Sequence, residues 1–383
     1  MINLKDKANC TGCTACQQVC GKNAIEMQFD SLGHTYPVVD SLKCIDCGLC
    51  EKVCPMLHLE ELPKDEKLDE LPVYAAYNKD NEARSRSTSG GLFTVLSKYI
   101  IESGGVVYAA RFNDEFHIYH DSFDKMDEID PFRGSKYAQS DLDGVFRRIK
   151  NELKNRKVLF VGTPCQVAGL KRFIRVNNPN LYTCDFICMC ISSSKIWEEY
   201  LDEYWNTETI KRIIFKDKRD SWHHWNLLIE DDRGEHLTKG SNDPFFKNYL
   251  NHNSSRPSCF ACPFRRVRRV SDFTIADAWG IDKVIPDFDD DKGCTTLILQ
   301  SKKAVEAYND FKKEIEVRKY SISDMVAYNP YFLKELTKSM EYMSFCDLYE
   351  NNSLRAALDV DFSISTHCII ERIINKLKRW ILK

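Results

Sequence analysis

The sequence predicts two domains, a small α+β domain at the N-terminus and a larger α/β domain behind it. One cysteine pattern occurs twice within residues 1–58, and the stretch between the two copies alternates around a glycine-containing turn. From residue 73 onward, apolar strands enter helices through turns of small residues, which is typical of an α/β domain. With 383 residues, the chain is also too long for one ordinary core.

The composition excludes several classes of protein. The 54 Lys and Arg residues nearly balance the 57 Asp and Glu residues, and the formal charge of −3 argues against a nucleic-acid-binding protein. No stretch reaches the roughly 18 apolar residues of a membrane span, and residues 1–10 lack the pattern of a secretory signal. We therefore expect a cytoplasmic protein, in which clustered members of the 17 cysteines serve as metal ligands or redox groups rather than as disulfides.

The N-terminal cysteines form two runs with the spacing of bacterial ferredoxins. In each run three cysteines are separated by two residues, and a fourth follows after three more. In that pattern, three thiolates of one run and the fourth thiolate of the other bind one [4Fe–4S] cluster. We therefore assign one cluster to Cys10, Cys13, Cys16 and Cys54, and the second to Cys44, Cys47, Cys50 and Cys20. Zinc, the alternative, usually takes two separated pairs of cysteines.

Residues 1–58 as a whole resemble a dicluster ferredoxin. Pro55 follows the second run as the pattern expects, whereas Gly21 stands where the first proline would be. Residues 24–40 predict a hairpin that brings the two cysteine loops side by side. The charged, proline-bounded stretch 59–72 has the composition of a linker.

The larger domain is expected over residues 73–335, with a C-terminal helical extension at 336–383. Residues 88–112 supply a small-residue turn, an amphipathic helix and a strand, and residues 157–173 supply a strand, a turn and a helix. This order predicts a largely parallel sheet whose ligands lie beyond the carboxyl ends of the strands. The turn at 88–91 has the free backbone N–H groups that a phosphate requires, although such a turn also occurs as an ordinary helix cap.

Further cysteines gather in three phrases of the larger domain, "GTPCQ", "TCDFICMCISS" and "RPSCFACPF". Four of them can furnish a third cluster, namely Cys165, Cys188, Cys259 and Cys262. The spacing leaves open a zinc site, a thiol–disulfide pair at Cys259 and Cys262, and simple buried thiols.

Several phrases, taken in order, resemble the coenzyme F420 hydrogenase/dehydrogenase β-subunit family. They are "STSGG", "FRGSKYAQS", "VGTPCQ", "DFICMCISSSKIWEEYL" and "RPSCFACPFRRVRRVSDFTIADAWGI". The resemblance implies FAD in the α/β domain and an iron–sulfur cluster beside it, with Cys165, Cys188, Cys259 and Cys262 as its ligands. It leaves Cys184 and Cys190 as spare thiols, and Cys190 stands where relatives tend to have glycine. It also implies flavin contacts at Ser89, Gly90, Gly91, Lys136, Tyr137, Thr163, Pro164 and Gln166.

The expected function follows from these two kinds of cofactor. Iron–sulfur clusters transfer single electrons, whereas a metabolite or a deazaflavin takes a hydride, and a flavin converts between the two. We expect an FAD-dependent iron–sulfur oxidoreductase that passes electrons among a ferredoxin or another redox partner, the clusters, FAD and a small-molecule substrate. The alternatives are an enzyme that reduces F420 or oxidises F420H2, and an electron-relay subunit of a larger complex. Catalytic residues are not indicated by the sequence.

Three further features have competing interpretations. Arginines surround the second C-x-x-C and can neutralise FAD phosphates, an anionic substrate or an acidic partner, or form a solvated strand edge. They are Arg256, Arg265, Arg266, Arg268 and Arg269. His223 and His224 lie between tryptophans, where they indicate either a proton donor or core packing. Residues 368–383 predict a basic amphipathic helix, which can lie on a membrane surface, contact a subunit or dock on the protein's own core.

Overall fold

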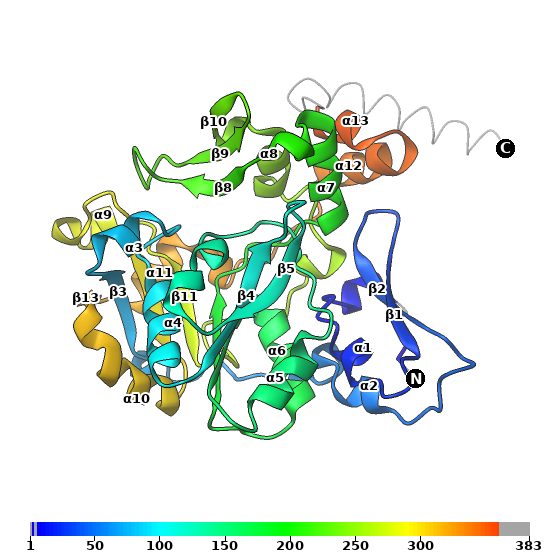
Figure 1. The fold of residues 1–383 in the computed structure, drawn as a ribbon, viewed down its shortest axis with the longest axis horizontal. Coiled ribbons are helices and arrows are strands. Elements are labelled where there is room, and N and C mark those ends of the chain that lie inside the picture. Colours follow the sequence, from blue (N-terminus) through cyan, green and yellow to red (C-terminus); the bar gives the residue numbers. More distant parts are fainter. Residues whose placement is uncertain (1, 4–5, 360–383) are drawn as a thin grey trace.

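The computed structural model describes residues 2–3 and 6–359 (Figure 1). The amphipathic helix expected at 368–383 lies outside these described residues. Among the described residues, no helix is both long and apolar enough to cross a membrane.

The N-terminal domain contains two short helices and one hairpin. The helices are α1 (Ala15–Val19) and α2 (Leu49–Lys52), and the strands β1 (Ile25–Phe29) and β2 (Thr35–Val39) pair in antiparallel fashion. The predicted hairpin is therefore confirmed. Each helix begins within a cysteine run and the two helices touch, so the two runs lie next to each other.

An eight-stranded sheet forms the centre of the larger domain, in the order β13-β3-β12-β11-β7-β6-β4-β5. Its strands are β3 (Val73–Asn78), β4 (Val106–Phe112), β5 (Ile118–Phe123), β6 (Val158–Gly162), β7 (Leu181–Phe186), β11 (Phe273–Asp277), β12 (Thr295–Leu299) and β13 (Ile315–Lys319). The middle strands β4, β6, β7 and β11 are parallel, and every other pairing is antiparallel. The sheet is thus mixed rather than largely parallel, because strands from both ends of the domain add to its two edges.

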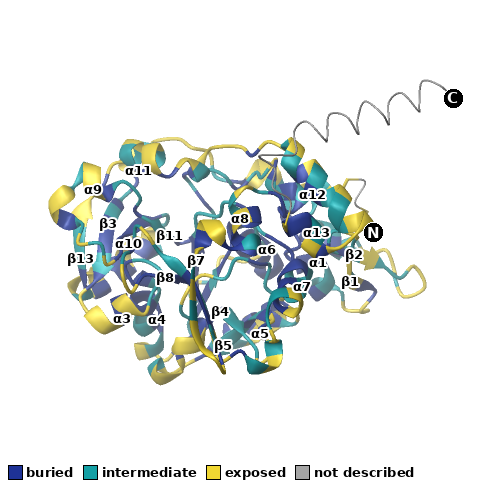
Figure 2. Cartoon of the chain, turned by 90° about the horizontal axis from the view of Figure 1, so that it is seen from above, coloured by how far each residue is buried: buried dark blue, intermediate teal, exposed yellow. Residues whose placement is uncertain are grey.

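Helices cover both faces of this sheet. Helices α4 (Leu92–Glu102) and α10 (Lys302–Phe311) pack on one face, and α5 (Val145–Glu152) and α6 (Pro164–Ile174) pack on the other. Successive side chains of a strand point to opposite faces, so strand residues alternate between the two cores. Strands β6, β7 and β12 are almost entirely buried, in contrast to the exposed outer elements drawn in yellow in Figure 2.

A further apolar core, in addition to the cores on the two sheet faces, lies beyond the carboxyl ends of the parallel strands. It joins a three-stranded antiparallel sheet to four helices. These elements are β8 (Arg212–Asp217), β9 (Asn226–Asp231), β10 (Gly234–Lys239), α7 (Ser194–Tyr204), α8 (Pro244–Leu250), α12 (Met340–Asn351) and α13 (Leu354–Leu358). Shorter helices α3 (Asn81–Ser85), α9 (Ile281–Val284) and α11 (Ile322–Tyr328) lie at the other end of the large sheet (Figure 1).

The N-terminal domain packs against α5 and α6 (Figure 1). The Gln18 amide bridges the two domains, since its Nε2 donates to Leu142 O (2.9 Å) and its Oε1 accepts from Phe146 N (2.7 Å). Gly169 of α6 allows Cys13 to pack against this helix, because a Cβ at position 169 would lie 2.8 Å from Cys13 Sγ. The first cysteine run is therefore pressed directly onto the larger domain.

Candidate functional site

The two cysteine runs have the same backbone conformation. Gly12 and Asp46, at equivalent positions, have φ values of 69° and 50°, and Thr14 and Gly48, two residues later, have φ values of 60° and 69°. Such alternation of left-handed and right-handed residues turns backbone N–H groups inward and forms concavities that suit anionic clusters. Gly12 N accordingly donates to Cys10 Sγ at 3.4 Å. The repeat seen in the sequence is thus a repeat in structure.

The second run and the last cysteine of the first run enclose one cavity. Cys20, Cys44, Cys47 and Cys50 all line this space of about 240 Å³, together with apolar residues of β1 and β2. The sulfurs of Cys20 and Cys50 accept hydrogen bonds from backbone N–H groups at 3.3 Å each. Cys47 is exposed whereas Cys50 is buried, so this cavity lies close to the surface. These four residues are the set that the crossed ferredoxin pairing predicts.

The other predicted set is buried between the two domains. Burial raises the pKa of the Cys13 and Cys16 thiols well above the ordinary value, and the nearby thiolates of Cys10 and Cys54 raise it further. All four cysteines are thus close enough to interact through their charges. Cys165 of the larger domain also raises the pKa of Cys13, so this set lies near the cavity of that domain.

The larger domain contains a cavity of about 490 Å³ beyond the carboxyl ends of its parallel strands. Its walls include the ends of β4, β6, β7 and β11, and Lys216 of β8 also lines it. Phe93, Phe186 and Ile275 supply apolar surface, while the turns at 87–91 and 133–140 supply polar groups. The volume lies within the range of ordinary cofactor and ligand pockets. The cavity therefore lies where the sequence predicted a ligand.

Seven of the eight predicted flavin contacts line this cavity. They are Ser89, Gly91, Lys136, Tyr137, Thr163, Pro164 and Gln166. Gly90 does not line the cavity. Its N–H donates to Thr295 Oγ1 (2.9 Å) and is therefore not free for a phosphate. A Cβ on Gly90 would lie 2.5 Å from Ala76 O, so this glycine allows the turn to pack on β3 and β12.

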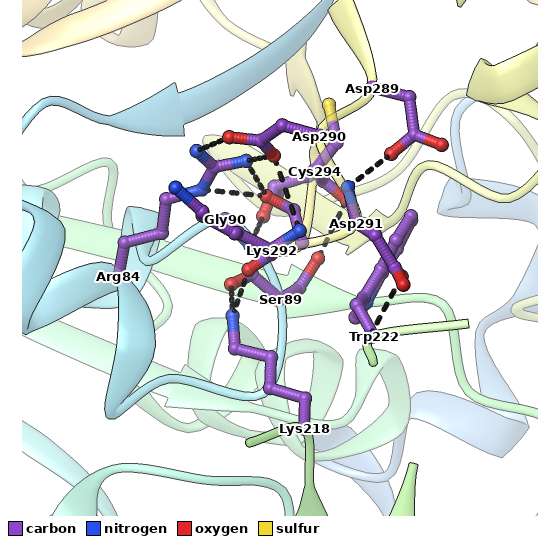
Figure 3. A network of polar contacts seen from close by, with 12 residues as sticks. Arg84, Ser89, Gly90, Lys218, Trp222, Asp289, Asp290, Asp291, Lys292 and Cys294 are labelled. Carbon is purple, nitrogen blue, oxygen red and sulfur yellow. Dashed lines mark hydrogen bonds and ion pairs between the residues drawn. The ribbon is translucent and has the colours of Figure 1, made fainter. Parts of the chain in front are cut away.

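The glycine turn is held rigidly from behind (Figure 3). Ser89 Oγ donates to Cys294 O (2.6 Å), and Lys218 Nζ donates to the carbonyl oxygens of Ser89 and Lys292. The guanidinium of Arg84 binds Asp290 with two hydrogen bonds and also donates to a backbone carbonyl of the same loop. The turn therefore has a fixed conformation before any ligand arrives.

Lys136 places a cation at the cavity wall. Its ammonium donates to Arg133 O (2.9 Å) and Gly134 O (3.1 Å). Burial lowers the pKa of Lys136 to about 7, and the charge of Arg111 adds to this effect. An anionic ligand would favour the protonated form of this lysine.

The phrase "GTPCQ" forms the start of α6. Thr163 and Gln166 make a reciprocal capping box, with Pro164 in the first helical turn. This cap fixes Cys165 in that turn, where Thr163 Oγ1 lies 3.1 Å from its Sγ. Burial raises the pKa of Cys165 to about 11, the charge of Cys262 also raises it, and Arg256 opposes the rise.

Cys165, Cys188, Cys259 and Cys262 all line the same cavity. Burial raises the pKa of Cys188 well above its ordinary value, and the thiolates of the other three and of Cys190 raise it further. Cys184 is fully buried in β7, does not line the cavity and has its Sγ 3.6 Å from Asp185 O. Cys190 does line the cavity, with its Sγ 3.8 Å from Tyr249 O.

A lysine in β8 was not indicated by the sequence. Lys216 Nζ lies 2.8 Å from Asp277 Oδ2 and 4.3 Å from the centre of the Trp279 ring, and all three residues line the cavity. Trp222 stacks on Trp279 and donates to Asp277 Oδ1 (3.2 Å). Lys216 lies in a strand 61 residues before Asp277, so only the fold brings the two together.

The other sequence candidates have structural partners. His223 contacts Asp289 Oδ2 (2.8 Å) and His224 is exposed, and neither lines the large cavity. Arg266 and Arg268 donate to carbonyl oxygens of the stretch 63–67 and fix it to the larger domain. Arg269 pairs with the buried Asp185 at 3.6 Å.

The small domain carries two groups of four cysteines and lies beside a cavity that five more cysteines line. This arrangement is typical of a redox protein of the iron–sulfur class. Three family models match the chain. Residues 9–57 match a 4Fe-4S dicluster domain, residues 73–147 match the N-terminal part of the coenzyme F420 hydrogenase/dehydrogenase beta subunit, and residues 155–324 match its C-terminal part. The chain belongs to the coenzyme F420 hydrogenase/dehydrogenase beta-subunit family of oxidoreductases and carries a domain for two [4Fe–4S] clusters. The resemblance seen in the sequence is therefore confirmed.

The individual relatives share 16–31% sequence identity with this chain, in each case over only part of its length. A coenzyme F420-dependent sulfite reductase of Methanocaldococcus jannaschii is 31% identical over 35% of this chain and 26% of its own length. An uncharacterised protein of the same organism is 23% identical over 46% of this chain and 57% of its own length. The chain thus spans about a quarter of the length of the sulfite reductase and somewhat over half of the length of the uncharacterised protein. Among solved structures, it is similar to a chain of the F420-reducing [NiFe] hydrogenase complex from Methanosarcina barkeri, with 16% identity, a TM-score of 0.47, and coverage of 65% of this chain and 81% of that chain.

Proposed function

We propose that this chain is an iron–sulfur flavoprotein oxidoreductase, which passes electrons between its clusters and FAD and from FAD to a two-electron substrate. The observation that carries this proposal is the shared cavity. Five cysteines, among them the four predicted ligands, and seven of the predicted flavin contacts line one space beyond the strand ends. A cluster and a flavin bound there would lie next to each other.

The cysteines are ordered from the surface to this cavity. The set with Cys47 is near the surface, and the set with Cys13 is buried against α6. Cys13 and Cys165 interact through their charges, so the buried set adjoins the cavity cysteines. This order supports a path from a redox partner through two N-terminal clusters to a third cluster held by Cys165, Cys188, Cys259 and Cys262. In this proposal Cys188 is the ligand from its segment, and Cys190, which also lines the cavity, is the alternative, whereas Cys184 lies outside the cavity.

The residues of the cavity fit FAD. The fixed turn at Ser89 and Gly91 offers small side chains and backbone groups to the phosphates, whereas the capping box of α6 occupies the N–H groups of Thr163 and Gln166. Lys136 offers a positive charge, and the phenyl groups of Phe93 and Phe186 offer apolar surface to the ring system. When bound, the flavin supplies the conversion between single electrons and a hydride. The paired Lys216 and Asp277 form a buried ion pair on the β8 side of the cavity, where they can orient a polar substrate.

F420 is one candidate for the two-electron substrate. The family name and the name of the sulfite reductase both refer to this deazaflavin. That relative shares only 26% of its length with this chain, so its sulfite chemistry is not part of the proposal. An electron-relay subunit, which passes electrons to a catalytic partner, is the second candidate function.

Anaerobic stopped-flow spectroscopy tests the proposal. Purified chain is mixed with reduced ferredoxin, and absorbance is followed at cluster and flavin wavelengths, with and without F420. The clusters should be reduced before the flavin, and added F420 should reoxidise the flavin if it is the substrate. Cluster reduction with no bound flavin would contradict the flavoprotein proposal. A reduced flavin that no small acceptor reoxidises would favour the relay subunit.

A further inference from the structure

Arg256 is a fully buried arginine between the two domains. Its exposed fraction is 0%, and its backbone precedes the C-x-x-C pair of the cavity by three residues. Its N–H donates to Ile191 O at 3.0 Å, which ties the backbone to the segment after Cys190. From this position in the larger domain, the side chain reaches across to the first cysteine run.

The guanidinium contacts the N-terminal domain with most of its donors. Nε donates to Cys10 O (2.8 Å), and Nη2 donates to Thr35 O (2.7 Å) and lies 3.6 Å from Cys10 Sγ. Nη1 donates to Gln139 Oε1 (3.0 Å), and the guanidinium lies 4.4 Å from the centre of the Tyr36 ring. None of these partners is a carboxylate.

The absence of a side chain at Gly12 leaves room for Arg256 and Gln139. A Cβ at Gly12 would lie 2.4 Å from Gln139 Nε2 and 2.9 Å from Arg256 Nη1. Gly12 therefore lets the arginine and the glutamine approach the loop that carries Cys10 and Cys13.

A buried charge without a counter-ion is unfavourable, so the charge of Arg256 needs compensation from nearby anions. The hydrogen-bond partners of the guanidinium are two carbonyl oxygens, an amide oxygen and the Cys10 sulfur, which lies 3.6 Å from Nη2. Of these four groups, only the Cys10 sulfur becomes an anion, because a metal-bound cysteine is a thiolate. A cluster bound by this thiolate would therefore supply the negative charge that balances the guanidinium.

We propose that Arg256 raises the reduction potential of the cluster held by Cys10, Cys13, Cys16 and Cys54, and so favours electron transfer onto this cluster. The proposal rests on the cluster assignment made under the proposed function. Reduction adds one negative charge to a cluster, and a buried cation with an N–H donor directed at a ligand sulfur stabilises that charge. Arg256 acts through the ligand and is therefore a positioning residue, not a catalytic one.

Potentiometric titration followed by EPR tests this role in the full chain. Arg256→Gln removes the charge and keeps a donor, and it should shift one cluster to a more negative potential. We expect about a tenfold change in its ratio of oxidised to reduced forms at fixed potential, which is about 59 mV for a one-electron couple. The signal is assigned with Cys16→Ser, which perturbs the same cluster directly.

Two further variants keep the test decisive. Arg256→Lys retains the charge but not the fork of donors, so its shift should be smaller, and it serves if Arg256→Gln does not assemble the cluster. Arg147→Gln is the control, because this exposed arginine also donates to carbonyl oxygens of the N-terminal domain, at Gln18 and Cys20, and has no sulfur among these hydrogen-bond partners. It should leave the potential of the Cys16-dependent cluster unchanged.

The outcomes separate this inference from the proposed function. Wild-type protein without iron–sulfur EPR signals would overturn both. Intact signals with an unchanged potential in Arg256→Gln would overturn only the role of Arg256. Equal shifts in Arg256→Gln and Arg147→Gln would assign the effect to domain docking and would likewise overturn it.

Discussion

Gly169 of α6 offers a sharp test of how the two domains meet. In an exposed helix, Gly→Ala stabilises by about 0.5–1 kcal/mol, because alanine loses less backbone entropy on folding. At position 169, however, the new Cβ would lie 2.8 Å from Cys13 Sγ and 3.0 Å from Cys13 Cβ. Carbon atoms pack best at about 3.5–4.0 Å, so roughly 1 Å of movement is needed.

The cysteine cannot easily supply this movement. In the proposed assignment its sulfur would bind an iron of a cluster that three other thiolates also bind, and Phe146 lies 3.6 Å from the new Cβ. Overpacking of this kind costs about 1–3 kcal/mol, which exceeds the gain in helix propensity. We therefore expect Gly169→Ala to destabilise the protein by up to about 2 kcal/mol and to weaken the retention of one cluster.

Anaerobic denaturant unfolding and iron analysis measure both effects. Gly21→Ala is a suitable control, because it lies next to Cys20 and its Cβ would meet no atom within 4 Å. The control should keep its iron and its stability. A Gly169→Ala protein with full iron content and a higher free energy of unfolding would refute the position assigned to Cys13.

Further variants test the cavity, the glycine turn and the exposed cluster. Cys188→Ser should lower the iron content by about four per chain, whereas Cys184→Ser, whose sulfur lies outside the cavity, should not; equal losses would contradict the ligand assignment. Gly90→Ala should destabilise by about 1–3 kcal/mol and release flavin, because its Cβ meets a backbone carbonyl of β3 at 2.5 Å; retained flavin would argue against this. Leu42 and Ile45 are 96% and 64% exposed beside the surface cluster, so changing both to Lys should slow reduction by ferredoxin severalfold and leave reduction by dithionite unchanged. Loss of both rates would point to a damaged cluster instead.

The grouping of the N-terminal cysteines could be predicted because their spacing is local. Eight cysteines in two runs imply a crossed pairing, and the fold brings Cys20 to the second run through the hairpin between them. The capping box of "GTPCQ" is equally local, since Thr163 and Gln166 are three residues apart. The family resemblance then added the flavin contacts, which spacing alone did not indicate.

Features that depend on distant segments were not predictable in this way. The antiparallel strand β12 pairs with β3, more than two hundred residues earlier, and this makes the sheet mixed. Lys216 meets Asp277 only because β8 lies above the sheet. Arg256 was grouped with its neighbours by sequence, whereas its contacts with Cys10 depend on how the domains dock.

Iron, sulfide and flavin analysis of anaerobically purified chain tests the central claim most directly. Three [4Fe–4S] clusters and one flavin predict about twelve irons, about twelve sulfides and about one FAD per chain. About eight irons would remove the cavity cluster while leaving the N-terminal domain intact. Colourless protein with no flavin and no EPR signal after reduction would contradict the whole account.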